Sequence, residues 1–341
     1  MTPSSAALET LFPAQNILRN TALLRFPRKS IDSQKRNRIW RQEGFEMEIR
    51  TDLAMEAAAG SRGQNTQGVR IEKYDRAGMS MTSVEILTEE AARRLKKPIG
   101  RYVTAEELHL TANFRDSREH TEGLAEEIRR MLPESGTVLV AGLGNREITA
   151  DALGPKSVSY ILATRHFQGE LAKSTGLDRL RSVAAVATGV LGQTGLEATE
   201  LICSIVRSIR PCALIAIDAL AARSASRLGN TVQIGNSGIA PGSGVGNHRM
   251  ALNEETLGLP VIGIGVPTVV DAAALAYDLL QPHEALSEKT LEERLGKNRA
   301  LTVTPGNIDV LTDRAAKLVG MAVNCALHSS FDFDTLAALT S

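Results

Sequence analysis

Two aspartates stand where the sheet of an α/β protein would position reactive side chains. Asp151 follows a short apolar run at 137–141 and a glycine turn at 142–145, a pattern that predicts a buried strand ending in a tight turn. Asp218 directly follows a second apolar run at 213–217, so we expect it to end a strand as well. Because ligands bind outside the carboxyl ends of strands in open α/β sheets, the two carboxylates are expected to face one crevice.

Paired carboxylates can perform acid–base chemistry on water. If the two groups lie a few ångströms apart, repulsion between like charges raises the pKa of one of them, and the pair shares a proton. One member can then activate water while the other protonates a leaving amine, which hydrolyses a peptide without a metal or a covalent nucleophile. Alternatively, the pair could hold a divalent cation together with a third ligand. Each acid alone also suits a helix cap, and Asp218 suits an ion pair with Arg223.

Other chemistries find less support in the sequence. The turn at 142–145 does not complete a dinucleotide-binding fingerprint, because Glu147 stands where a third glycine is required. The glycine-rich stretch Gly235–Gly246 can present backbone N–H groups to a substrate or an oxyanion, or it can be a plain surface loop. A serine nucleophile at Ser237 or Ser243 would lack the GxSxG context.

The composition limits which classes of binding partner and which cellular compartment are expected. Lysine plus arginine and aspartate plus glutamate both number 39, so the formal charge of zero gives no electrostatic case for direct nucleic-acid or membrane binding. The three cysteines lack CxxC spacing and the six histidines lack HxxxH or HExxH spacing, so no metal site and no cofactor is predicted. No signal peptide or membrane-spanning run is recognised, and a reducing, cytoplasmic setting fits the cysteine usage.

The elements that must position the aspartates alternate between strands and helices. A helix is expected from about Asp151 to about His166, and a break at 100–104. Further strands are predicted at 69–72, 83–87, 182–187, 231–234 and 260–266, and further helices after Thr88 and over 117–131, 195–210, 269–280 and 304–328. This alternation predicts an α/β fold with right-handed crossovers and a mostly parallel sheet.

The chain divides by composition into unequal parts. Residues 1–46 hold a basic stretch without sustained periodicity, which indicates a disordered extension or upstream sequence translated from a start codon placed too early. A single α/β domain is expected to extend to about residue 330, followed by a tail at 331–341.

Several long motifs together resemble the germination proteases of spore-forming bacteria, endopeptidases that degrade small acid-soluble spore proteins. The resemblance covers roughly residues 47–328. The motifs are IRTDLAMEA (49–57), GRYVT (100–104), VAGLGNREITADALGPKSV (140–158), TGLEATE (194–200), AIDALAARS (216–224), NSGIAPGSGVGN (236–247) and GLPVIGIGVPTVVDA (258–272).

This resemblance implies a fold like that of the hydrogenase-maturation proteases, an α/β sheet with helices on both faces, as well as a homotetramer and a location in the spore core. It also implies two catalytic aspartates, which match Asp151 in TADALGP and Asp218 in AIDALAARS. The hydrogenase-maturation relatives bind nickel through two acids and a histidine, and a nickel-binding peptidase of that type is the alternative function. His248 lies in the glycine-rich loop, but no histidine of this chain can be matched to the nickel ligand.

The resemblance also gives a meaning to the segment Thr51–Glu56. Substrates of the family are cut within a sequence like Thr-Glu-Phe-Ala-Ser-Glu, after the first Glu, and TDLAME has the same pattern. We therefore expect a zymogen that cuts itself between Asp52 and Leu53, which makes 47–52 the end of a prosegment and 53–330 the protease domain. Acidification would neutralise Asp52 and reduce its repulsion from the catalytic acids. An ordinary capped helix over Thr51–Ala59 is the alternative.

Two further residues are candidates for supporting roles. Glu197, at a predicted helix start, can line the crevice or favour the helix dipole. Arg223 can stabilise a tetrahedral oxyanion or pair with Asp218. A third hypothesis is a non-catalytic α/β binding protein in which Asp151 and Asp218 are caps.

Overall fold

A computed structural model describes residues 51–60, 67–110, 117–167, 173–174, 176–240, 250–280 and 301–340. The chain divides into two units, Met1–Glu46 and Met47–Ser341, and every described residue belongs to the second. The predictions for the amino-terminal extension, for Ser243 and for His248 lie outside the described residues.

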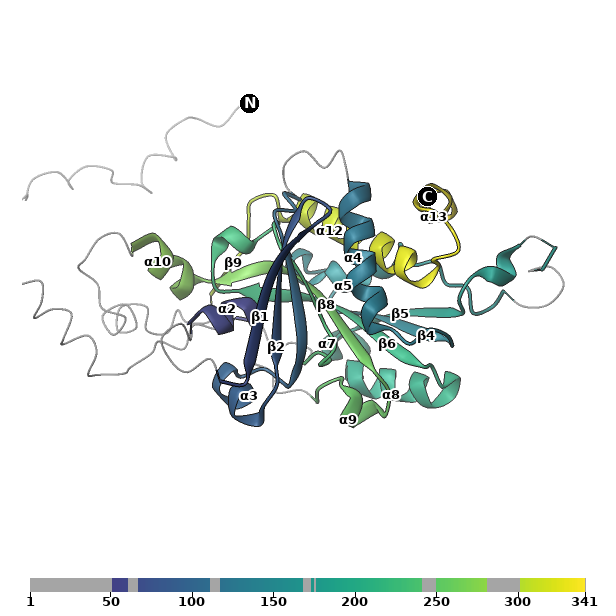
Figure 1. The fold of residues 1–341 in the computed structure, drawn as a ribbon, viewed down its shortest axis with the longest axis horizontal. Coiled ribbons are helices and arrows are strands. Elements are labelled where there is room, and N and C mark those ends of the chain that lie inside the picture. Colours follow the sequence, from purple (N-terminus) through teal and green to yellow (C-terminus); the bar gives the residue numbers. More distant parts are fainter. Residues whose placement is uncertain are drawn as a thin grey trace, which may run out of the picture. The chain divides into compact units, whose positions relative to one another are not determined.

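A mixed sheet runs through the second unit (Figure 1). Its order is β1-β2-β3-β7-β8-β6-β4-β5, with β9 paired to β8. Strands β8, β6, β4 and β5 run parallel, and the remaining pairs are antiparallel. The bounds are β1 Val69–Arg76, β2 Met79–Ile86, β3 Gly100–Glu106, β4 Val138–Leu143, β5 Val183–Gly189, β6 Ala213–Ala222, β7 Val232–Gly235, β8 Val261–Asp271 and β9 Thr302–Val303.

The α/β class is confirmed, but the sheet is mixed and not mostly parallel. Strands β1 and β2 are joined by Ala77 and Gly78, both with positive φ, and a two-residue link of this kind allows only antiparallel pairing. The break predicted at 100–104 was wrong, because these residues begin β3, which is paired with β2 on one side and β7 on the other. The antiparallel pairing of β1 with β2 therefore comes from a short connection that strand periodicity alone does not reveal.

Helices cover both faces of the parallel half (Figure 1). On one face, α4, α5 and α12 pack on inward residues such as Val140 and Ile215, and on the other face α8 packs on residues such as Leu139. The helix bounds are α2 Ala54–Gly60, α3 Glu89–Leu95, α4 Ser117–Met131, α5 Leu153–Val158, α7 Leu191–Thr194, α8 Ala198–Ile209, α9 Glu254–Leu257, α10 Ala272–Leu280, α12 Ile308–Leu327 and α13 Phe333–Thr340, with 3₁₀ turns η1 Thr149–Asp151, η2 Leu177–Arg179 and η3 Ala225–Arg227.

Two helical predictions differ from the structure. The helix expected to reach His166 ends at Val158, because Asn324 of α12 binds the following backbone in a non-helical form, accepting from Leu162 N at 2.9 Å and donating to Tyr160 O at 2.7 Å. The segment predicted as a tail contains α13, whose Leu336 is fully buried in the core. In both places, contacts with α12 decide the conformation.

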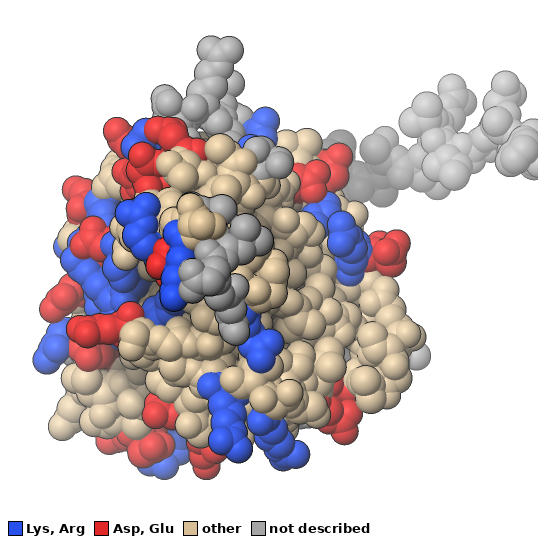
Figure 2. Space-filling model, turned by 90° about the vertical axis from the view of Figure 1, so that its right-hand side faces the viewer, with Lys and Arg blue, Asp and Glu red and all other residues tan. Residues whose placement is uncertain are grey.

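The surface carries both signs of charge. On the face drawn in Figure 2, basic and acidic side chains are interspersed over much of the surface, in keeping with the zero formal charge of the sequence. In the part of the chain that the structure describes, no helix combines the length and the apolar composition needed to cross a membrane.

Buried His328 makes the stability of the fold depend on pH. This residue follows α12 and is 1% exposed, and burial lowers the pKa of its imidazole from 6.5 to about 4. The unfolded chain therefore takes up the proton first as the pH falls. The stabilisation is fully present above the unfolded pKa and is lost as the pH falls through the window between the two pKa values.

We predict that the free energy of unfolding falls by about 2 to 3 kcal/mol between pH 7 and pH 4.5 because of His328 alone. Replacing it, His328→Gln, should remove that part of the pH dependence in urea unfolding curves. The control His166→Gln changes an exposed histidine and should leave the change of unfolding free energy with pH as it is in the wild-type chain. If the unfolding free energy of the wild-type and His328→Gln chains changed equally with pH, His328 would not be the source of this pH dependence.

Candidate active site

The turn after β4 holds Asp151 close to the sheet. Gly144 has a φ of +109°, and a Cβ atom there would lie 2.1 Å from the backbone oxygen of Asp151, so only glycine fits. The Asp151 carboxylate accepts a hydrogen bond from Asn145 N at 2.7 Å. One residue earlier, Ala150 O accepts from the Thr268 hydroxyl of β8, also at 2.7 Å. These contacts fix η1, and with it Asp151, at the carboxyl end of β4.

Helix α5 begins directly against the end of β4 and the middle of β6. A Cβ atom on Gly154 would lie 2.3 Å from Leu143 O of β4 and 2.4 Å from Ile217 O of β6. The missing side chain therefore lets the helix backbone touch both strands, which brings η1 against β6 and β8. The glycines before and after Asp151 thus set its distance from the sheet.

Asp218 lies inside β6 and not at its end. The sequence predicted a strand that ends at Asp218, but β6 continues to Ala222 because β8 pairs with it through the pair Ala222↔Val270. Asp218 is 6% exposed, and one of its oxygens accepts from Ala219 N at 2.9 Å. Its position in the strand places it on the face that packs against α8.

The structure brings the two aspartates to the same edge of the sheet. Strands β4 and β6 are parallel neighbours, and their pairing ends at Gly142↔Ile217, one residue before Asp218. Asp151 follows the end of β4 in η1, which contacts β6. Both aspartates therefore lie near the point where the pairing of β4 with β6 ends, and their joint action on one bound group stays a prediction.

The supporting candidates have other contacts. Glu197 is the N-cap of α8 and forms a capping box with Glu200, which is the helix-end role considered from the sequence. Arg223 follows β6, and in the described part of the chain it forms no ion pair with Asp218. Its backbone N–H donates to the Glu56 carboxylate at 2.7 Å.

The segment Thr51–Glu56, which we call the docked segment, lies against the strand that carries Asp218. Asp52 N donates to Ala221 O at 2.9 Å, and Ala221 N donates to the Asp52 carboxylate at 2.8 Å. Leu53 is fully buried and packs against Leu220 and Ala222 of β6. The predicted cleavage site is therefore held on β6, a few residues beyond Asp218.

Glu56 anchors the other end of the docked segment. Its carboxylate accepts from Arg223 N at 2.7 Å, from Ser224 N at 3.1 Å and from the Thr51 hydroxyl at 2.5 Å. Glu56 is 8% exposed, so these bonds replace the water that a buried carboxylate loses. Because Asp52 binds Ala221 near the end of β6 and Glu56 binds the two residues that follow the strand, the bond between Asp52 and Leu53 has a defined place on the sheet.

Gln233 also contacts this bond and was not singled out from the sequence. Its side-chain amide donates to Asp52 O at 3.1 Å and accepts from Ala54 N at 2.7 Å, so it spans the Asp52–Leu53 peptide. A single glutamine in a short strand has no sequence signal that marks it. Only the folded arrangement of the docked segment against β7 reveals it.

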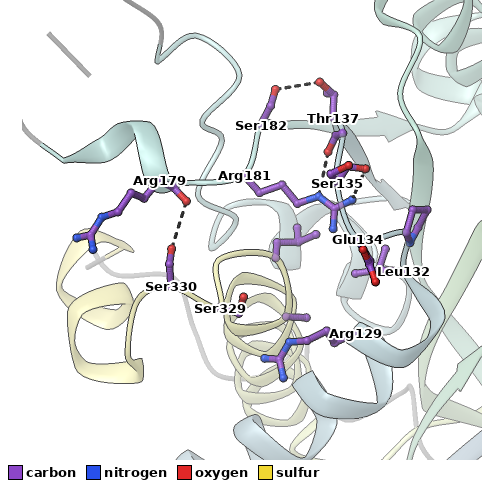
Figure 3. Close-up of a pocket in the computed structure, with 14 residues that line it drawn as sticks. Arg129, Leu132, Glu134, Ser135, Thr137, Arg179, Arg181, Ser182, Ser329 and Ser330 are labelled. Atoms are coloured by element: carbon purple, nitrogen blue, oxygen red, sulfur yellow. Dashed lines mark hydrogen bonds between the residues drawn. The ribbon is translucent and has the colours of Figure 1, made fainter. Parts of the chain in front are cut away.

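A cavity of about 630 Å³ lies at the opposite end of the parallel strands (Figure 3). It is lined by Thr137 and Ser182, which precede β4 and β5, and by three arginines. Arg181 donates to the backbone oxygens of Gly136 and Ser135, so its guanidinium joins two loops of the fold. The cavity is distant along both strands from Asp151 and Asp218 and is separate from the candidate active site.

Among the described residues, no three His, Cys, Asp or Glu side chains are grouped as metal ligands would be.

The sequence model of a protein family described as "Germination protease" matches residues 46–282. The chain belongs to the germination protease family. It is therefore a peptidase, as the motifs around Asp151 and Asp218 had indicated. The matched range includes the docked segment and both aspartates.

Individual germination proteases match most of the chain. The protein from Clostridium perfringens (strain 13 / Type A) is 40% identical over 310 residues, which cover 82% of this chain and 95% of that protein. The protein from Priestia megaterium is 34% identical over 362 residues, covering 86% of this chain and 97% of that protein. Among solved structures, a [NiFe] hydrogenase maturation protease, HycI from Thermococcus kodakarensis KOD1, is similar over 58% of this chain and 98% of that chain, with 14% identity and a TM-score of 0.32.

A substitution at Gly154 tests how this germination protease positions Asp151. The variant Gly154→Ala should lower the free energy of unfolding by about 3 kcal/mol, because the new Cβ meets backbone oxygens that cannot rotate away. Peptidase activity should fall by more than the unfolded fraction accounts for, because α5 and η1 must shift to accommodate the new Cβ. Urea unfolding and peptide hydrolysis measure the two effects.

The matched control is Gly192→Ala in α7, where no atom lies within 4 Å of the added Cβ. Its unfolding free energy should stay within about 1 kcal/mol of wild type. A Gly154→Ala chain as stable as this control would show that α5 does not touch the strands as described.

Proposed function

We propose that this peptidase is a self-processing zymogen and that its aspartate pair activates water for endopeptidase cleavage. The observation that carries the proposal is the docking of Asp52 and Leu53 on β6, the strand that contains Asp218. A bond that is to be cut within its own chain must be held beside the catalytic groups, because correct positioning supplies much of the rate of such a reaction.

The proton transfers of the proposed reaction take place between the two carboxyl groups, water and the leaving nitrogen. One carboxylate takes a proton from water as the oxygen adds to the carbonyl carbon of Asp52, and the carbonyl electron pair moves onto its oxygen. When this oxyanion reverts to a carbonyl, the bond to Leu53 N breaks and the other carboxyl group donates its proton to that nitrogen. The products are a prosegment that ends at Asp52 and a protease that begins at Leu53.

The remaining parts of the proposal rest on the family resemblance. The substrates are small acid-soluble spore proteins, degraded in the spore core when germination begins, and the active form is a homotetramer. The relatives are named germination proteases, which supports a role at this stage. The substrate is a protein chain whose cut site has the pattern of Thr51–Glu56.

Replacing either aspartate tests the mechanism. Asp151→Asn and Asp218→Asn should each slow the appearance of an N-terminus at Leu53 by at least about 100-fold, since an amide cannot exchange the proton. Asparagine can still accept the hydrogen bonds from Asn145 N and Ala219 N, so the variants should fold. The measurement is N-terminal sequencing after incubation from mildly acidic to mildly alkaline pH, with hydrolysis of a TEFASE-type peptide as a second readout.

The control Asp178→Asn changes an exposed acid of η2 and should process at the wild-type rate. Processing by both active-site variants at an unchanged rate would retire the aspartate mechanism, and a new terminus other than Leu53 would refute the cut site. Nickel analysis of the purified protein and its sensitivity to chelators separate this mechanism from that of a nickel-binding maturation peptidase.

A further inference from the structure

The docked segment crosses the sheet on the face that carries Asp218. It begins at the edge of β6 that β4 leaves uncovered, because β4 pairs with β6 only as far as Ile217 while β8 continues to Ala222. Asp52 pairs there with Ala221, and the next two residues reach across to β7, where Ala54 N donates to the Gln233 side chain. Residues 52–54 thus reach from β6 to the side chain of a β7 residue.

Asp218 and Gln233 belong to one row of this sheet. Gly265 of β8 is paired with Asp218 on one side and with Gln233 on the other. Residues paired across strands point their side chains to the same face, and two strand spacings separate the Cα atoms of Asp218 and Gln233 by about 10 Å. Both side chains therefore stand on the face over which the docked segment passes.

Gly265, between them, adds no side chain to the row. A Cβ atom at this position would lie 2.4 Å from Leu220 Cγ, so Leu220 lies over the glycine. Leu53 packs against this same Leu220. The residue that follows the predicted cut is therefore held above the strand that lies between Asp218 and Gln233.

The hydrogen bonds of Gln233 fix the orientation of its amide. The backbone N–H of Ala54 can only donate, and the carbonyl oxygen of Asp52 can only accept. Gln233 Oε1 must therefore face Ala54 N, at 2.7 Å, and Nε2 must face Asp52 O, at 3.1 Å. At 8% exposure, the glutamine makes these bonds where little water competes with them.

We infer that Gln233 is a catalytic residue of the self-processing reaction, whose amide N–H stabilises the oxyanion that forms on Asp52 O. The inference rests on the proposed function, because Asp52 O is the carbonyl oxygen of the bond proposed to be cut. When water adds to the carbonyl carbon, the electron pair moves onto this oxygen, and the hydrogen bond from Nε2 becomes charge-assisted and stronger. When the bond to Leu53 N breaks, the carbonyl forms again and the hydrogen bond returns to its initial strength.

The variant Gln233→Glu separates this role from docking. A glutamate has almost the same shape and keeps an oxygen for Ala54 N, but an ionised carboxylate has no N–H for Asp52 O. We expect the first-order rate of appearance of the Leu53 terminus to fall by about 100- to 1,000-fold, the usual effect of removing one oxyanion donor. Ala54 N–H should remain protected from hydrogen exchange, which shows that the docked segment stays in place.

A second variant and a control complete the test. Gln233→Met has a similar volume, carries no charge and lacks the donor, so its processing should be slowed to a similar degree. Ile234→Val perturbs the same strand on its opposite, buried face, and its processing rate should be that of wild type. Thermal unfolding of all three chains establishes that each is folded at the assay temperature.

The possible results are distinct. Slow processing of Gln233→Glu with Ala54 N–H still protected supports the inference. Slow processing with rapid exchange at Ala54 overturns it, because Gln233 would then only hold the segment. An unchanged rate in Gln233→Glu also overturns it, while the proposed function stands if the wild-type chain yields Leu53. Absence of any cut in the wild-type chain overturns both.

Discussion

The place of the docked segment depends on the difference in length between β6 and its neighbour β4. Strand β6 continues for five residues beyond its last pair with β4, and this uncovered stretch begins at Asp218 and ends at Ala222. A strand edge with unpaired N–H and C=O groups attracts another extended chain. Here Asp52 of the same molecule takes that place at Ala221. The strand that carries a catalytic candidate thus also holds the chain that is proposed to be cut.

Part of the candidate site could be predicted from sequence, because its turns and helix starts depend on only a few consecutive residues. The apolar run before Gly142 and the glycines after it fix a strand and a tight turn, so Asp151 was placed correctly at the carboxyl end of β4. The helix after Thr88 was also predicted correctly, since its hydroxyl accepts from Ala91 N as an N-cap does. Such features depend on a few consecutive residues and on backbone preferences.

The rest depends on contacts between distant parts of the chain. Strand β6 was predicted too short, because its last residues are held by β8 and by the docked segment, and not by their own β propensity. Helix α5 was predicted too long, because the apolar pattern did not show that Asn324 binds the backbone at Tyr160 and Leu162. Gln233 could not be found from sequence, since its role exists only when Asp52 and Ala54 lie beside it.

If Asp52 occupies the uncovered edge of β6 until the chain is cut, the amide of Ala221 reports on the cut most directly. In the uncut chain, Ala221 N–H is bonded to the Asp52 carboxylate and should exchange slowly with solvent deuterium. After cleavage and removal of the prosegment, the same amide should exchange at least about tenfold faster, because its partner has left. Equal exchange rates before and after the cut would contradict the account.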